Sequence, residues 1–128
     1  MKIRWAPPSR WSPSRHDMNI IKINEVNAAE GLSIVLKTLF DIDVTQKGRL
    51  TIGTAQIPPG VRVPAEGEGV HDGDEYAILF KGSARIVSGG TEYRMSADQA
   101  SFIPAGEAHW SINDGDTDCE LVWILVTP

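Results

Sequence analysis

The sequence has little of what several classes of protein require. Its single cysteine, Cys119, cannot form an internal disulfide, so the chain suits a reducing compartment. No apolar stretch approaches the roughly 20 residues that a membrane-spanning helix needs. The arginines near the N-terminus are not followed by the apolar segment of a secretory signal. We therefore expect a soluble cytoplasmic protein that does not bind a membrane.

Basic clusters and nucleophile motifs are also absent. The net charge is −5, the chain has 12 basic and 17 acidic residues, and no basic cluster lies in the body of the chain. Nucleic acid binding needs a basic face that neutralises phosphates, so we expect no nucleic acid partner. The chain has no glycine-rich phosphate loop, no Ser-His-Asp order and no CxxC pair. Cys119 is therefore interpreted as a half-buried structural thiol rather than as a nucleophile.

Length and turn-forming residues indicate one all-β domain. A chain of 128 residues can build a single core but not two. Its 12 glycines and 8 prolines separate short runs that are rich in valine, isoleucine and threonine, which is typical of a sandwich or barrel. Residues 1–17 contain proline, arginine and tryptophan without any periodicity, so we predict an irregular N-terminal arm there and one β-barrel domain over 18–128.

Period-2 alternation and turn residues predict ten strands. The predicted ranges are 19–26, 32–40, 49–57, 61–64, 75–80, 84–87, 91–95, 100–103, 109–113 and 121–126. The run 41–48 is polar and is predicted to be a loop. The runs 75–80 and 121–126 are apolar on both faces, so one sheet should be covered from outside by N-terminal strands, by another subunit or by both. We therefore predict a homodimer.

Two histidines and a glutamate lie at the ends of predicted strands. His71 and Glu75 precede one apolar run, and His109 begins another strand. If both strands face into a barrel, the three side chains converge. Two imidazoles and a carboxylate suit iron, manganese, nickel, copper or zinc and leave coordination positions open. Each histidine alone is explained better by hydrogen bonds to neighbouring polar groups, but together the three favour a site for a divalent transition metal.

These residues resemble the two motifs of the cupin superfamily. The first spacing is His71-x3-Glu75-x6-Gly82. The second is Pro104-x-Gly106-x2-His109-x3-Asn113. The segment 59–64 looks like the one that leads into the first motif. The resemblance implies a double-stranded β-helix, or jelly roll, that is often dimeric, and it implies that His71, Glu75 and His109 are three of four metal ligands.

The sequence departs from the cupin pattern at two positions. Gly69 stands where cupins usually carry the remaining histidine ligand, and Glu66 and Glu68 lie close by in an acidic, glycine-rich loop. One of these acids could serve as the fourth ligand or as a general base, a water could fill the gap, or the site could have lost its metal. Asp98 stands where the second motif usually begins with glycine, which affects a turn and not the ligands.

The leading functional prediction is a small metal-dependent cupin that binds a compact, polar organic molecule and acts on it. The resemblance admits dioxygenase, isomerase, lyase or decarboxylase chemistry. The alternative is a non-catalytic ligand-binding or sensing module without a tightly bound metal, which Gly69 favours. A purely structural dimerisation domain would leave the inward polar cluster unexplained. Trp123 and Phe102 could line an apolar cavity, although core packing is the simpler interpretation.

Overall fold

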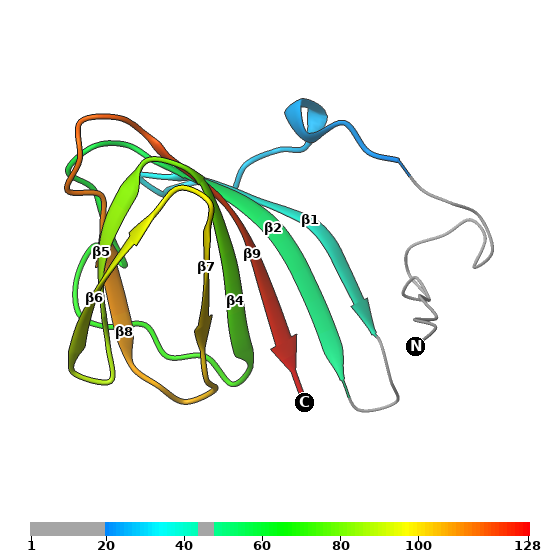
Figure 1. Ribbon diagram of the computed structural model, residues 1–128. Coiled ribbons are helices and arrows are strands. Elements are labelled where there is room, and N and C mark those ends of the chain that lie inside the picture. Colours follow the sequence, from blue (N-terminus) through cyan, green and yellow to red (C-terminus); the bar gives the residue numbers. More distant parts are fainter. Residues whose placement is uncertain (1–19, 44–47) are drawn as a thin grey trace.

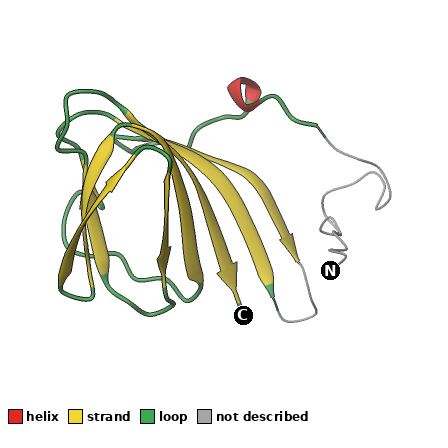
Figure 2. Ribbon diagram, in the orientation of Figure 1, coloured by secondary structure: helices red, strands yellow, loops and turns green. Residues whose placement is uncertain are grey.

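The computed structural model describes residues 20–43 and 48–128, and this part of the chain contains nine strands and one short 3-10 helix, Ile23–Glu25 (Figures 1 and 2). The strands are β1 Val35–Asp43, β2 Arg49–Ile57, β3 Arg62–Val63, β4 Asp74–Lys81, β5 Ser83–Ser88, β6 Thr91–Ser96, β7 Gln99–Ile103, β8 His109–Ile112 and β9 Cys119–Thr127. The predicted arm over 1–17 lies outside the described residues.

The strands form two antiparallel sheets that enclose the interior of a jelly roll. The five-stranded sheet has the order β1-β2-β9-β4-β7, and the four-stranded sheet has the order β3-β8-β5-β6. In Figure 1 the last strand, β9, lies between β2 and β4. The predicted all-β jelly roll is thus confirmed. No helix in the described part of the chain is long and apolar enough to cross a membrane.

The predicted first strand over 19–26 is wrong. The described part of that range contains the 3-10 helix, which closes through a hydrogen bond from the Glu25 amide to the Lys22 carbonyl. Ile20 and Ile23 are 81% and 47% exposed, so neither gains the burial that would hold a strand on a sheet. The first strand of the described residues therefore begins only at Val35. Isoleucine favours strands locally, but strand formation needs a neighbouring edge.

The loop predicted over 41–48 begins later than expected, because β1 continues to Asp43. Its last residues pair with the start of β2, with Asp41 opposite Thr51 and Asp43 opposite Arg49. The Arg49 guanidinium also donates a hydrogen bond to the Asp41 carboxylate at 2.7 Å. This ion pair links the two strands and makes an acidic residue compatible with a strand position.

The turn between β6 and β7 explains the departure at Asp98. This residue has φ = 70°, the left-handed conformation that glycine adopts most easily, and it is the only described non-glycine residue with a positive φ. Aspartate is among the few other residues that tolerate this region. Its amide donates to the Leu79 carbonyl at 2.8 Å, which fastens the turn to β4. The substitution therefore preserves the turn.

The outer face of the five-stranded sheet is apolar and exposed. On β4, Tyr76, Ile78 and Phe80 alternate outward and are 40%, 39% and 57% exposed. Tyr76 lies opposite Phe102 on β7 and Ile124 on β9, so one apolar row crosses three strands. Phe102 is 54% exposed in this row and does not line the cavity. Among the described residues of this row on β4 and β7, each large apolar side chain is therefore at least 39% exposed.

One end of the interior is closed by core residues and by a buried asparagine. Leu79, Ile57 and Cys119 are at most 7% exposed and belong to the same hydrophobic cluster. Asn113 is 1% exposed, and its side-chain amide donates to the carbonyls of Ile57 and Thr117, both at 2.8 Å. The last residue of the second motif is therefore structural, because it ties three segments together at the closed end.

Candidate metal site and cavity

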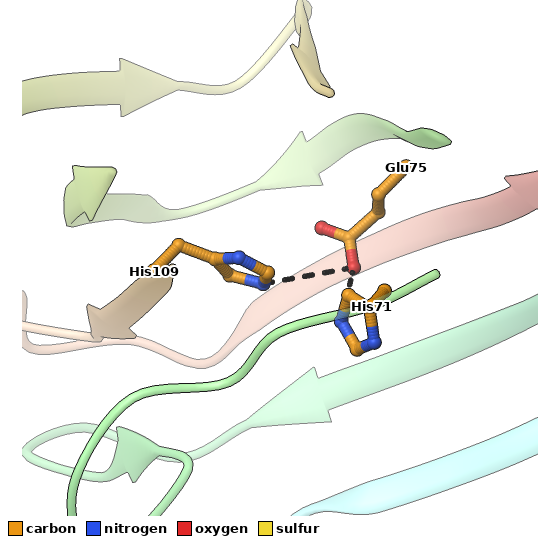
Figure 3. Close-up of side chains that lie close together, drawn as sticks. All are labelled: His71, Glu75 and His109. Carbon is orange, nitrogen blue, oxygen red and sulfur yellow. Dashed lines mark ion pairs between the residues drawn. The ribbon is translucent and has the colours of Figure 1, made fainter. Parts of the chain in front are cut away.

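Three side chains converge at the other end of the interior (Figure 3). His71 comes from the loop before β4, Glu75 from the start of β4, and His109 from the first position of β8. One Glu75 carboxylate oxygen, Oε1, lies 3.2 Å from His71 Nε2 and 3.9 Å from His109 Nε2. One ligand atom from each residue lies within 4.8 Å of the others, and within the described ranges this is the only such group of three.

Backbone hydrogen bonds place the two histidines against each other. The Gly106 amide donates to the His71 carbonyl at 2.8 Å, which joins the loop before β8 to the loop before β4. Gly69 and His109 exchange two backbone hydrogen bonds of 2.8 and 2.9 Å. The positions of the side chains thus follow from pairing between segments that are about forty residues apart in the sequence.

A hydrogen bond at Nδ1 determines which ring nitrogen of His109 carries a proton. Nδ1 lies 3.0 Å from the Glu107 carbonyl oxygen, which can only accept, so Nδ1 carries the proton and donates it. In the neutral ring, the Nε2 atom then presents a lone pair toward the Glu75 carboxylate. Two acceptors that face each other at 3.9 Å are compatible when a cation lies between them. This arrangement is the one that metal-binding histidines commonly adopt.

The donor separations fit one shared metal ion. Nitrogen and oxygen ligands lie about 2.0–2.2 Å from a divalent transition metal, so two ligands of one ion are at most about 4.4 Å apart. The two separations from Glu75 Oε1, 3.2 and 3.9 Å, satisfy this limit. The group of His71, Glu75 and His109 could therefore hold a metal ion.

Exposure of the three side chains shows that the site lies at the mouth of the interior. The side chain of His71 is 39% exposed, that of Glu75 is 24% exposed and that of His109 is 12% exposed. His71 therefore faces solvent, whereas His109 lies deepest. A small molecule can reach the group from outside while the rest of the molecule enters the barrel.

The acidic loop beside the site does not join it in this structure. Glu66 and Glu68 are exposed, and neither lines the cavity. Gly69 lies closer, since a Cβ atom placed on it would be 3.9 Å from His109 Nε2 and would meet no nearer contact than 3.7 Å. A side chain at position 69 would thus begin beside the site, which is where cupins usually supply a further histidine.

Behind the three side chains lies a cavity of about 420 Å³ with a mostly apolar wall. Trp123 forms part of this wall, as the sequence allowed. Its ring lies against Gly53 on β2, where any side chain would collide with it. Core packing was the interpretation favoured for Trp123, because alternation shows which side chains face inward and not how much space they leave.

Comparisons with known proteins identify the fold. The family model described as "Cupin domain" matches residues 53–125. The cupin domain of Cnp3 from Schizosaccharomyces pombe is 17% identical, with a TM-score of 0.68 over 84% of this chain and 72% of that one. A cupin 2 conserved barrel domain protein from Salinispora arenicola is 21% identical, with a TM-score of 0.67 over 86% and 89% of the two chains.

A predicted oxalate decarboxylase from Thermotoga maritima is also similar, at 17% identity and a TM-score of 0.60 over 86% of this chain and all of that one. These identities are low enough that the likeness concerns the fold alone. No curated protein matches the sequence.

Proposed function

This chain belongs to the cupin domain family, and from that premise we propose that it is a small metal-dependent cupin which binds a small organic molecule at the barrel mouth and transforms it. The observation that carries the proposal is the meeting of two imidazole nitrogens and one carboxylate around a point that a single ion could occupy. The predicted decarboxylase among the similar structures supports an enzymatic role without choosing the reaction.

His71, Glu75 and His109 would hold the metal. A bound divalent ion would supply Lewis acidity and open coordination positions for an oxygen of the substrate. The Glu107 carbonyl orients the His109 ring, and the Glu107 carboxylate accepts a hydrogen bond from the Ser88 hydroxyl at 2.5 Å. Glu107 in the loop before β8 is therefore hydrogen-bonded through both its backbone and its side chain, which keeps the His109 ring oriented toward the site.

Glu66 and Glu68 remain candidates for proton transfer. Both acids are exposed beside the mouth. Either carboxylate would act as a fourth ligand or as a general base only if its loop turned inward when the substrate binds. Exchange of both for glutamine should then lower the catalytic rate and leave the metal content unchanged.

Elemental analysis tests the metal site directly. Protein purified without chelator or affinity-resin metal should contain about one equivalent of a divalent transition metal per chain, and Glu75→Gln should lose it because a neutral amide is a much weaker ligand. Glu92→Gln is the matched control, since Glu92 pairs with Arg85 on the outside of the other sheet. Equal metal in all three proteins, or none in any, would contradict the proposal.

A ligand-binding or sensing module is the second candidate. Gly69 favours it, because the loss of one usual ligand weakens metal binding while leaving the cavity intact. Such a module would be stabilised against heat by its ligand in the presence of chelator. The metal-dependent protein would lose most of this stabilisation on chelation.

A second copy of the chain is the partner that we propose for the exposed face of the five-stranded sheet. Tyr76, Ile78 and Phe80 expose large apolar side chains there, and an apolar row that crosses several strands is typical of an interaction surface. The homodimer predicted from the doubly apolar strands would bury this face against its symmetry mate.

A further inference from the structure

The interior of the barrel is arranged in layers, of which only the first carries charged groups. Inward positions along β4 are Glu75, then Ala77, then Leu79. Their register partners on β9 are Leu125, Trp123 and Leu121. Because a strand rises about 3.3 Å per residue, the level of Leu79 lies about 13 Å from that of Glu75. A molecule bound at Glu75 therefore has apolar walls beside everything that extends inward.

Polar groups available to a ligand are concentrated at the mouth. Apart from the three candidate metal ligands, the described wall offers free hydroxyls only from Ser101 and Ser111, and it contains no lysine or arginine. The indole N–H of Trp123 and the thiol of Cys119 line the wall but already donate to backbone carbonyls. A second carboxylate would thus lose water in the cavity without gaining a cationic partner.

Small side chains create the space in the middle layer. Ala77 on β4 lies opposite Ser101 on β7 and Trp123 on β9. The Trp123 ring leans over Gly53 of β2, which leaves the centre of the layer open. The volume of about 420 Å³ falls within the range of about 300–1,000 Å³ that is usual for small-molecule sites. The cavity is therefore large enough for an apolar body and not merely for a metal ion with water.

We propose that the substrate is a molecule with one oxygen-bearing head and a compact apolar body, of the class of aliphatic or aryl monocarboxylic acids. This inference rests on the proposed function for the head, which would bind at His71, Glu75 and His109. It differs from the polar molecule expected from the sequence, because the cavity behind the head is lined by apolar side chains. The apolar body would lie between Ala77 and Trp123 and reach toward Leu79.

Calorimetric titration of the full metal-loaded chain tests this assignment. The probes are acetate, butanoate, hexanoate and octanoate, with oxalate and succinate as dicarboxylates. Burial of each added methylene should raise affinity roughly fourfold until the cavity is filled. Succinate should bind more weakly than butanoate, because its second carboxylate would lie in the apolar layer. Affinities that do not depend on chain length, or a preference for the dicarboxylates, would overturn the inference.

Cavity-filling variants locate the apolar body. Ala77→Leu should reduce the affinity for octanoate by about tenfold and leave that for acetate unchanged, since the leucine occupies the middle layer. Ser101→Leu fills the same layer from β7 and serves if the first variant does not fold. Ala100→Leu is the matched control, because Ala100 is exposed and pairs with Ile78 on the outer face. Equal octanoate affinity in a folded cavity variant and in the control would contradict the assignment.

Metal content separates this inference from the proposed function. If the protein holds one equivalent of metal but its affinity for monocarboxylates does not depend on their chain length, the metal site stands and the proposed substrate class is wrong. If the protein holds no metal but its affinity for monocarboxylates still rises with their chain length, the apolar binding cavity stands and the metal-dependent function is wrong. Each proposal can thus fail by itself.

Discussion

The two ends of the barrel interior are built from different kinds of residue. At the mouth, His71, Glu75 and His109 are partly exposed and face one another across loops. At the closed end, Leu79 and Cys119 are 2% and 0% exposed within a hydrophobic cluster. The difference indicates that the mouth binds charge and the closed end stabilises the fold, so each should respond to substitution without the other.

The largest expected change in stability comes from the closed end. Leu79→Ala should lower the free energy of unfolding by about 2–5 kcal/mol, because it removes a buried side chain and enlarges an existing space. Denaturant titration measures this loss, and the metal content should stay the same. Leu32→Ala is the matched control, since Leu32 is 52% exposed. A Leu79 variant that keeps its stability but loses its metal would reverse the roles of the two ends.

The next largest effect should come from adding a fourth metal ligand at the mouth, which should raise the affinity for metal. Gly69→His should raise the affinity for a divalent transition metal by about tenfold or more, because a side chain at position 69 begins 3.9 Å from His109 Nε2 and needs no positive φ. Competition with a chelator measures the gain. Gly69→Leu adds bulk without a donor and should give no gain. An equal change in both variants would exclude coordination by the new histidine.

The outer faces of the two sheets also differ, and this difference predicts which face forms the dimer interface. On the four-stranded sheet, Trp110 is covered by Arg62, whose guanidinium lies 4.3 Å from the ring centroid. On the five-stranded sheet, Tyr76, Ile78 and Phe80 stay between 39% and 57% exposed. Ile78→Lys should therefore shift the dimer toward monomer, whereas Val87→Lys on the other sheet should not. Light scattering across protein concentrations distinguishes the two, and a monomeric unmodified protein would refute the dimer.

The smallest expected effect concerns the thiol at the closed end. Burial raises the pKa of the Cys119 thiol above its usual value, so the unfolded chain loses this proton first as pH rises. The free energy of unfolding should fall slightly above the ordinary thiol pKa of about 8.5. Cys119→Ala should lack this pH dependence. A native thiol that reacts with an alkylating reagent as fast as in denaturant would show that this end is open.

Composition and alternation predicted an all-β barrel with three converging side chains, and the resemblance of two motifs to those of cupins implied the jelly roll. Alternation places Glu75 on the inward face, and the second motif places His109 at the start of its strand. The direction of the loop that carries Glu66 and Glu68 could not be predicted in this way, because their exposed positions depend on contacts that alternation does not encode. The strand expected over 19–26 is wrong because Ile20 and Ile23 stay 81% and 47% exposed and gain no burial that would hold them on a sheet.

The most direct test of the metal site is a titration of chelator-treated protein with a divalent transition metal, followed by calorimetry and compared with His109→Ala. The unmodified chain should take up one equivalent, because its three donors already surround one point. His109→Ala should bind at least about a hundredfold more weakly, since two ligands remain and their orientation is less restrained. No uptake by the unmodified chain, or equal uptake by both proteins, would contradict the metal site proposed for this cupin.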